Sequence, residues 1–474
     1  MPTRDHLIRL IDDIEAQYLV CWNVLRRLKE TKVDALFLPE LLKFQPTLRH
    51  ALLKQEDTRD VIHKEKRRLI AKKENLNSSW FRKRMRSLDN HLEILDNSIS
   101  IGKCLGDSFA WLFYQRDRHL LRKHCEAPRV FHTPTRIGGL GELQFINNIQ
   151  RLQGQIAICH STTTFLRLGD LSLIDPQSCT VSAIGELKTR QAGDQQLVAQ
   201  AIFLSPKAKA SVFDTSYQSA RVPPDENLPP QIRDRLVKQL GRMAAMFSPQ
   251  PSPEIQKMTV TGCAYVEKLR SVSEQLRSQE SAFVLADKGL MIAAVKDSGL
   301  RLSTRLTGQP KKAQLKKLDG VELAARNIVD KNLPNNSIRI GSFHYSVTEE
   351  YFLEEGLTPL FWWPLSTDFL RSIIFREVVI MTLYNPAFLL KKLQGIGLNV
   401  KYEHTHRTCE LSMKDPSGKT YQVVGLPYLI SLIQRNLFGE DAAVAMIQST
   451  LSNLQNKDLR QNTFVQVAID QKFR

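Results

Sequence analysis

The sequence has no long hydrophobic run, since no segment reaches the roughly 18 uninterrupted apolar residues that a membrane-spanning helix needs. It begins MPTRDHLIRLIDDIEAQYLV, a charged, amphipathic stretch that lacks the apolar core of a secretory signal peptide. These absences argue against a membrane protein and against a secreted one. We therefore expect a soluble, cytoplasmic protein.

Cysteine is scarce and scattered. The seven cysteines are odd in number and never occur in a C-x-x-C pair, which argues against a disulfide framework and against a zinc ribbon. The nearest approach to a zinc cluster is His404 and His406 with Cys409. Alternating histidines on a strand are also typical of an exposed surface, and no second ligand pair with zinc spacing accompanies them.

Two common catalytic motifs are also missing. There is no Walker-type glycine-rich phosphate loop, which argues against ATP hydrolysis within this chain. There is no G-x-S-x-G nucleophile elbow either, so the pair His160-Ser161 is interpreted as a polar strand end and not as part of a serine hydrolase. The sequence has no internal repeat and no long low-complexity tract.

The chain is long enough for several domains. Of its 474 residues, 42% are hydrophobic and 24% are charged, which is typical of folded globular proteins. Because single hydrophobic cores stop growing near roughly 250–300 residues, we expect two or three domains. The patterns favour a multidomain α+β or α/β protein with a helical N-terminal region, a mixed central core and an α+β C-terminal module.

Positive charge predominates. Lys and Arg number 66 against 49 Asp and Glu, which gives a formal net charge of +17 and a pI near 9.5. Polyanions are the natural partners of such a chain. Nucleic acid is the first candidate and an anionic membrane surface the second, and a merely basic, solvated surface is the alternative to both.

Residues 1–128 are expected to form a helical arm. Apolar residues recur at helical spacing, as at Leu7 and Ile11, and glycine is almost absent. Two or three long helices are expected, with Pro39 and Pro46 separating the first from the second. The arm is a candidate surface for nucleic acid, for a partner protein or for a second copy of the chain.

The pattern changes after the arm, where short β-type segments indicate a mixed core over residues 129–300 and then a C-terminal targeting or assembly module over residues 301–474. The core is expected to begin with a helix followed by three strands. The elements expected, in chain order, are a helix over 140–152, strands near 155–160, 163–175 and 180–188, an insertion near 190–230, a helix over 231–247, a strand over 258–268 and a hairpin over 281–297.

Basic residues gather in one part of the arm, between residues 63 and 86. This stretch holds ten Lys or Arg against two Glu, with Trp80 and Phe81 among them. Cations that contact phosphates and aromatic rings that stack on bases are typical of a nucleic-acid-binding surface. The alternative is a solvated helix pair whose aromatic side chains face a core. The candidate nucleic-acid-binding residues are Lys64, Lys66, Arg67, Arg68, Lys72, Lys73, Arg82, Lys83, Arg84 and Arg86.

Three ionisable side chains, Asp170, Glu186 and Lys188, are expected to converge on one end of a hairpin. Because side chains alternate along a strand, Glu186 and Lys188 point to the same face. Two carboxylates at short range oppose each other's ionisation, and a divalent cation such as Mg²⁺ or Mn²⁺, which prefers oxygen ligands, would neutralise them. The alternative is a hairpin with surface carboxylates and a salt-bridging lysine.

This arrangement resembles the PD-(D/E)xK nuclease superfamily, in which an Asp is followed by Glu-x-Lys on the next strand of a restriction-endonuclease-like αβββαβ core. The resemblance covers residues 136–268. An acidic residue on the preceding helix is frequent in that family, and Glu142 occupies the matching place. The proline of the family motif is absent, and Gly169 precedes Asp170 instead.

The resemblance implies metal-dependent hydrolysis of phosphodiester bonds. The metal ligands would be Glu142, Asp170, Glu186 and the carbonyl of Leu187, and Asp170, Glu186 and Lys188 would be the catalytic residues, with Lys188 acting on the attacking water. Accessory polar residues of the following helix would be Lys238 and Gln239.

The function expected from these features is that of a Mg²⁺-dependent DNA endonuclease, and family analogy suggests a role in prokaryotic restriction or anti-phage defence. RNA stays open as a substrate. The first rival is a protein that binds nucleic acid without cutting it. The second is a structural or regulatory subunit of a larger complex, which would use the N-terminal helices to pair with its partner.

Overall fold

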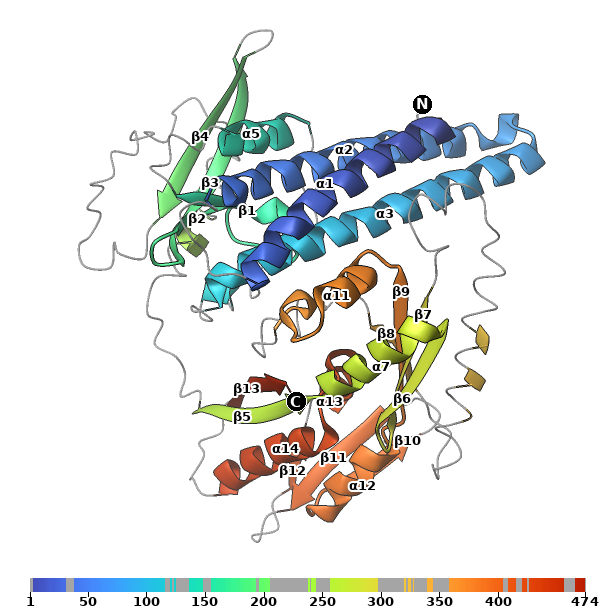
Figure 1. Cartoon of the computed structure of the whole chain (residues 1–474), viewed down its shortest axis with the longest axis vertical. Helices are drawn as coiled ribbons and strands as arrows, with labels where there is room; N and C mark the ends of the chain where they lie inside the picture. The colour runs from blue at the N-terminus through green and yellow to red at the C-terminus, as the bar shows by residue number, and fades with distance from the viewer. Residues whose placement is uncertain are drawn as a thin grey trace. The chain divides into compact units, whose positions relative to one another are not determined.

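The computed structural model divides the chain into two compact units (Figure 1). Unit 1 comprises Met1–Pro251 with Arg305–Thr307, and unit 2 comprises Ser252–Thr304 with Gly308–Arg474. The expected boundaries near residues 128 and 300 do not coincide with this division. The structure describes residues 3–30, 38–115, 120–121, 123–124, 136–147, 155–192, 196–204, 238, 240–243, 256–296, 319–320, 323–324, 327, 339–343, 358–403, 408–414, 420–423, 426–455 and 465–473.

Three long helices form the N-terminal part of unit 1, and they confirm the expected helical region. They are α1 (Arg4–Glu30), α2 (Leu38–Ala71) and α3 (Ser78–Tyr114), and a short 3₁₀ turn over Lys73–Asn75 lies between the last two. Each helix contacts the other two. The buried side chains of α1 recur every three or four residues, which gives the helix one apolar face; they are Leu7, Ile11, Ile14, Tyr18, Cys21, Trp22, Val24, Leu25 and Leu28.

The expectation that Pro46 helps to separate the first helix from the second is wrong, because Pro46 lies inside α2. A proline within a helix removes one backbone hydrogen bond. Here the residues on both sides are anchored by packing, since Phe44 and Leu48 are fully buried. Pro39, by contrast, lies in the first turn of α2, where the missing N–H has no helical partner to lose.

A four-stranded antiparallel sheet completes the described part of unit 1. Helix α5 (Arg136–Asn147) precedes strands β1 (Ile156–Cys159), β2 (Leu171–Asp175), β3 (Thr180–Ala192) and β4 (Gln196–Leu204), and the strand order is β1-β2-β3-β4. Helix α5 lies against β3 and β4, and α2 contacts both α5 and β1 (Figure 1). The core between α5 and the sheet is made by Ile146, Ala157, Cys159, Leu171, Leu173, Ala183 and Leu187.

The central elements differ in detail from those expected. The strand expected over 163–175 is confined to 171–175 and follows a 3₁₀ turn, η4 (His160–Thr162). An insertion was expected near 190–230, but its first part belongs to the sheet, as the end of β3 and the whole of β4. Residues 205–230 lie outside the described residues. The apolar run LVAQAIFL is typical of a strand, and it pairs with β3 over the whole length of β4.

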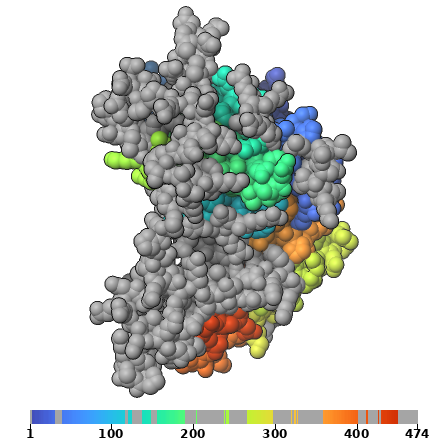
Figure 2. Space-filling model, turned by 90° about the vertical axis from the view of Figure 1, so that its left-hand side faces the viewer, coloured from blue at the N-terminus to red at the C-terminus, as the bar shows by residue number. Residues whose placement is uncertain are grey.

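The turn between β2 and β3 reaches the molecular surface, since Gln177 and Ser178 are exposed. Figure 2 shows part of the green segment of the chain, the colour of residues of β2 and β3, exposed on the face viewed. The described residues of β2 and β3 themselves are mostly buried.

The described part of unit 2 is a mixed helix-and-sheet structure with three small sheets. Strands β6 (Ser281–Asp287), β7 (Leu290–Lys296), β9 (Val378–Tyr384) and β8 (Arg339–Phe343) form an antiparallel sheet in that order, which confirms the hairpin expected over 281–297. A second antiparallel sheet consists of β10 (Asn399–Glu403), β11 (Thr408–Lys414) and β12 (Thr420–Val423), and the helices are α7 (Val266–Ser278), α11 (Thr367–Ile374), α12 (Ala387–Gly395), α13 (Leu426–Asn436) and α14 (Glu440–Gln455).

The strand expected over 258–268 is present as β5 (Gln256–Ala264), but it pairs in parallel with β13 (Val465–Phe473) near the end of the chain. It was expected to belong to the central core. The partner strand lies about 200 residues away in sequence, and local periodicity carries no information about such a distant pairing.

In the part of the chain that the structure describes, no helix combines the length and the apolar character needed to cross a membrane.

Candidate functional site

Strands β2 and β3 bring Asp170, Glu186 and Lys188 to one end of their hairpin. The antiparallel register places Asp170, which immediately precedes β2, beside Glu186. The backbone N–H of Asp170 donates to the Gly185 carbonyl at 2.8 Å, and the Leu187 N–H donates to Asp170 Oδ2 at 2.7 Å. The Asp170 side chain is therefore tied to the strand that carries Glu-x-Lys.

Glu186 and Lys188 lie on the same face of β3 and form an ion pair, with Lys188 Nζ 2.6 Å from Glu186 Oε1. The Glu186 side chain is 2% exposed, whereas 41% of the Lys188 side chain is exposed. The alternative interpretation, a hairpin whose carboxylates lie at the surface, is therefore wrong for Glu186. The ammonium group of Lys188 lies where a buried carboxylate meets solvent.

Burial and the charge of Glu186 both disfavour ionisation of Asp170. Burial, followed by the charge of Glu186, raises the pKa of Asp170 to about 7, against the lowering effect of the Leu187 N–H. Glu186 Oε2 is buried and accepts no hydrogen bond from the described residues. A buried carboxylate oxygen without a donor is costly, and a cation bound between the two groups would remove that cost.

Gly169, which immediately precedes Asp170, has a conformation that proline cannot adopt. Its φ is +75°, whereas the proline ring holds φ near −65°. A Cβ at this position would lie 2.7 Å from the Gly185 carbonyl oxygen. The close approach of the loop to β3 therefore requires glycine before Asp170.

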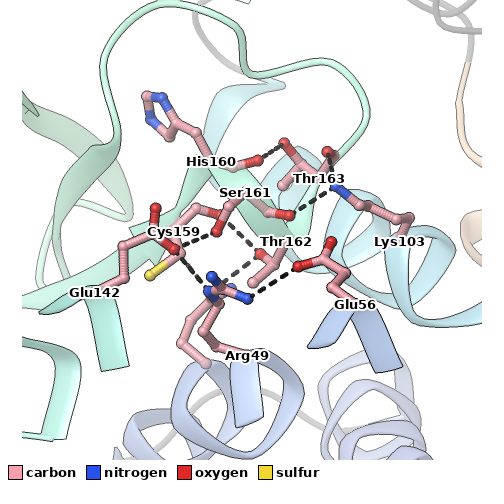
Figure 3. Close-up of polar contacts among 10 residues, drawn as sticks. Arg49, Glu56, Lys103, Glu142, Cys159, His160, Ser161, Thr162 and Thr163 are labelled. Carbon is pink, nitrogen blue, oxygen red and sulfur yellow. Dashed lines mark hydrogen bonds and ion pairs between the residues drawn. The ribbon is translucent and has the colours of Figure 1, made fainter. Parts of the chain in front are cut away.

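Glu142 lies near this end of the sheet, on α5, and its carboxylate is held by two other groups (Figure 3). Arg49 Nε lies 2.6 Å from Glu142 Oε2, and the Ser161 hydroxyl donates to the same oxygen at 2.6 Å. Burial raises the pKa of Glu142 against the lowering charge of Arg49. The charge of Glu142 also raises the pKa of Asp170, so the two carboxylates belong to one electrostatic cluster.

Arg49 was not identified from the sequence, although it is the central cation of this cluster. Its side chain is fully buried in α2, and a second carboxylate, that of Glu56, lies 3.6 Å from one of its terminal nitrogens. The sequence does contain a signal that Arg49 is buried. Arg49 directly follows Leu48, and Leu52 and Gln55, which come later at helical spacing, are fully buried as Leu48 is. A charged residue on a buried helical face indicates a buried partner, but not which one.

Lys103 of α3 holds the turn that follows β1. Its Nζ donates to the Ser161 carbonyl at 2.7 Å and to the Thr163 carbonyl at 3.4 Å, and burial lowers its pKa. Figure 3 shows Lys103 reaching the turn from the side opposite Glu142. The polar pair His160-Ser161 is thus part of the framework around the site.

The donor set present at the end of β2 and β3 fits a hard divalent cation. It consists of the carboxylates of Asp170 and Glu186 and of the Leu187 carbonyl, which points to the same side of β3 as the Leu187 N–H. Among the described residues, no group of three or more His, Cys, Asp or Glu side chains is placed to hold a metal ion. Two acidic side chains, those of Asp170 and Glu186, are therefore left for a metal, because the Glu142 carboxylate is paired with Arg49.

Other predicted residues stand apart from this cluster. Lys238 is helical and exposed, and nothing in the described part of the chain joins it to the site. Gln239, His404 and His406 lie outside the described residues.

The basic stretch forms the tip of the hairpin made by α2 and α3, at the end of these helices away from the sheet of unit 1 (Figure 1). Trp80 is 49% exposed and Ile70 is 55% exposed, so the alternative in which the aromatic side chains face a core is wrong for Trp80. Two cations of the stretch have acidic partners, since Lys66 pairs with Asp89 and Arg68 Nε lies 3.1 Å from Glu65. The basic residues in the exposed class are Lys64, Arg67, Arg68, Lys72, Lys73, Arg82, Lys83 and Arg86.

Comparison with known proteins gives no relative: no family model, no curated protein and no solved structure matches the chain.

Proposed function

We propose that the chain is a metal-dependent nuclease that hydrolyses phosphodiester bonds, with DNA as its substrate. The observation that carries the proposal is the buried pair Asp170 and Glu186 with an acceptor oxygen left unsatisfied, beside the half-exposed ammonium of Lys188. The combination of two neighbouring buried carboxylates and a cation at a solvent boundary is typical of a site that binds a metal and a phosphate.

Asp170 and Glu186 hold Mg²⁺ or Mn²⁺ in this proposal, together with the Leu187 carbonyl. Bound there, the ion supplies Lewis-acid polarisation of a phosphodiester oxygen and a more acidic water. Lys188 holds its ammonium 2.6 Å from Glu186, at a position where it orients a water or a phosphate oxygen. Glu142 serves as the third acidic residue of the cluster, and Arg49 sets the direction of its carboxylate.

The order of elements supports the assignment to a restriction-endonuclease-like core. Helix α5 followed by β1, β2 and β3 reproduces the αβββ beginning of that core, with the Asp before β2 and Glu-x-Lys on β3. The next element is β4, antiparallel to β3, where the family has a helix. A role in restriction or anti-phage defence follows from family analogy alone.

Replacement of Lys188 by Ala is expected to lower metal-dependent cleavage of supercoiled and linear DNA at least about a hundredfold, because the charge that faces the developing phosphate charge is lost. The measurement is a plasmid-nicking assay with Mg²⁺, with Mn²⁺ and with EDTA, which should abolish cutting. Lys54→Ala is a matched control, since the Lys54 side chain is 39% exposed and its Nζ lies 2.9 Å from Asp13. A Lys54 variant that loses as much activity as the Lys188 variant would refute the assignment.

The tip of the α2–α3 hairpin is proposed as the nucleic-acid-binding surface of the arm. The helical rise of about 1.5 Å per residue puts the tip roughly 30 Å from Arg49 along α2, a span of about nine base pairs of duplex. At this distance from the cluster, the exposed cations are placed to contact phosphates on either side of the cleavage point. The exposed indole ring is placed to stack on a base there.

The double replacement of Lys72 and Lys73 by Gln is expected to weaken binding equally on all DNA sequences and to lower the slope of log K against log salt by up to about two, because each phosphate contact contributes about 0.9. Replacement of Arg277 and Lys288, exposed residues of unit 2, removes the same charge and should leave the slope unchanged. Fluorescence anisotropy at several salt concentrations measures both. Equal slopes for the two double variants would rule out the tip.

A second candidate function, binding of nucleic acid without cleavage, is favoured by one observation. Arg49 and Ser161 occupy Glu142 Oε2, which leaves two acidic side chains for a metal where the family commonly has three. This candidate predicts DNA binding that is indifferent to EDTA, and no cleavage by the wild type under any metal.

A further inference from the structure

A row of four buried side chains lies behind the loop that carries Asp170. Tyr114, His124 and Ser172 are fully buried, and His160 is 3% exposed. The Tyr114 hydroxyl lies 3.2 Å from His124 Nε2 and 2.5 Å from the Ser172 hydroxyl oxygen. The Ser172 oxygen in turn lies 2.6 Å from His160 Nε2. The four side chains therefore form one continuous hydrogen-bonded chain across α3, β2 and η4.

The position of the proton on His124, at the first end of this hydrogen-bonded row, is set by backbone groups. The backbone N–H groups of Arg167 and Leu168 donate to His124 Nδ1 at 3.2 Å and 3.1 Å. Because a nitrogen that accepts carries no proton, the neutral His124 ring bears its proton on Nε2 and donates to the Tyr114 oxygen. Burial lowers the pKa of His124 well below its ordinary value, in agreement with a neutral ring.

The position of the proton on His160, at the other end of the row, is also set by a backbone group. His160 Nδ1 lies 3.0 Å from the Gly169 carbonyl oxygen, which only accepts, so Nδ1 carries the proton and Nε2 accepts from the Ser172 hydroxyl. The Ser172 oxygen is then free to accept from Tyr114. All four hydrogen bonds thus run in one direction, from His124 to the Gly169 carbonyl.

His160 holds the residue pair Gly169 and Asp170 at two points. Its ring donates to the Gly169 carbonyl at 3.0 Å, and its backbone N–H donates to the Asp170 carbonyl at 2.9 Å. Gly169 has a φ of +75°, which glycine adopts without strain, so its conformation depends on contacts such as these two. We infer that the buried chain of Tyr114, His124, Ser172 and His160 is a positioning device that fixes the Asp170 carboxylate through the Gly169 carbonyl.

The catalytic meaning of this inference rests on the proposed function, but the positioning itself is testable without cleavage. The amide nitrogen of Asn takes the place of histidine Nδ1, and that of Gln takes the place of Nε2. His160→Asn therefore keeps the donor to the Gly169 carbonyl, and His160→Gln loses it. Both variants remove the imidazole ring, so their comparison separates positioning from general packing.

The first readout is hydrogen exchange of the Leu187 amide, which donates to Asp170 Oδ2. Loss of one hydrogen bond of about 1 kcal/mol predicts about fivefold faster exchange in His160→Gln, measured relative to the Ile184 amide of the same strand. The wild type and His160→Asn should exchange alike. The second readout is cleavage, where kcat should fall at least about tenfold in His160→Gln with KM unchanged, and less in His160→Asn.

Equal exchange of the Leu187 amide in the two variants would overturn the inference and leave His160 a packing residue. The same holds if nitrogen NMR of histidine-labelled protein shows the His160 proton on Nε2 or the His124 proton on Nδ1. A wild type that cleaves no substrate would overturn the proposed function instead. In that case the exchange rates and the histidine tautomers still decide whether the device positions Asp170.

Discussion

Replacement of Asp170 by Asn is expected to make the protein more stable at pH 8 and inactive as a nuclease. Burial and the charge of Glu186 raise the pKa of Asp170 from its ordinary value of 3.8 to about 7. The ionised carboxylate therefore destabilises the folded state, while Asn keeps an oxygen that accepts from the Leu187 N–H. In the proposed mechanism the same substitution removes a metal ligand, and cleavage should fall at least about a hundredfold.

The sign of the pH dependence follows from the proton count. Between pH 4 and 7 the folded state keeps a proton on Asp170 that the unfolded state has lost, so stability from this group falls as the pH rises. Each pKa unit corresponds to about 1.4 kcal/mol. The advantage of Asp170→Asn over the wild type should thus grow from near zero at pH 4 to as much as about 4 kcal/mol at pH 8.

Urea unfolding of both proteins at pH 4, 6 and 8 measures this difference, and addition of Mg²⁺ provides the control. At pH 8 a metal at one hundred times its Kd stabilises the wild type by about 2.7 kcal/mol, and Asp170→Asn should not respond. Asp175→Asn is a second control, since Asp175 ends β2, the strand that Asp170 precedes, and accepts from the Gln177 N–H in the turn. A difference between wild type and Asp170→Asn that stays constant with pH would contradict the raised pKa of Asp170.

The sequence alone predicts those features that depend on residues close together in the chain. The periodicity of Leu7 and Ile11 predicts helix α1, and strand alternation predicts that Glu186 and Lys188 share a face. The hairpin of β6 and β7 follows from the turn between two apolar segments. In each of these cases a few neighbouring residues contain the whole signal.

The features that the sequence does not predict depend on residues far apart. Arg49 and Glu142 are 93 residues apart, and nothing near either residue indicates the other. Pro46 remains helical because tertiary packing outweighs its local cost. The irregular segment between η4 and β2 was expected to be a strand, but its backbone follows side-chain contacts such as that of His160 with Gly169.

Replacement of Arg49 by Met is expected to destabilise the fold by about 3–5 kcal/mol, the usual cost of removing one member of a buried ion pair. The Arg49 side chain is fully buried and lies 2.6 Å from Glu142 and 3.6 Å from Glu56. Both buried carboxylates would lose the cation that contacts them, and the charge of Lys103 would remain as a more distant interaction. Arg59→Met is the matched control, since Arg59 pairs with Asp96 at 2.8 Å with both side chains exposed, and it should cost about 1 kcal/mol or less.

The double variant Arg49→Met with Glu142→Gln tells whether this cost comes from the uncompensated charge or from lost packing. If charge dominates, the second substitution restores part of the stability that the first removes, because a neutral amide is cheaper to bury than a lone carboxylate. If packing dominates, urea unfolding will show the two losses adding within about 0.5 kcal/mol. Additive losses would contradict the role of Arg49 as the counter-charge of the cluster. Restoration would show that α2 stabilises the acidic site through the charge of Arg49, because Arg49 joins α2 to the Glu142 of α5.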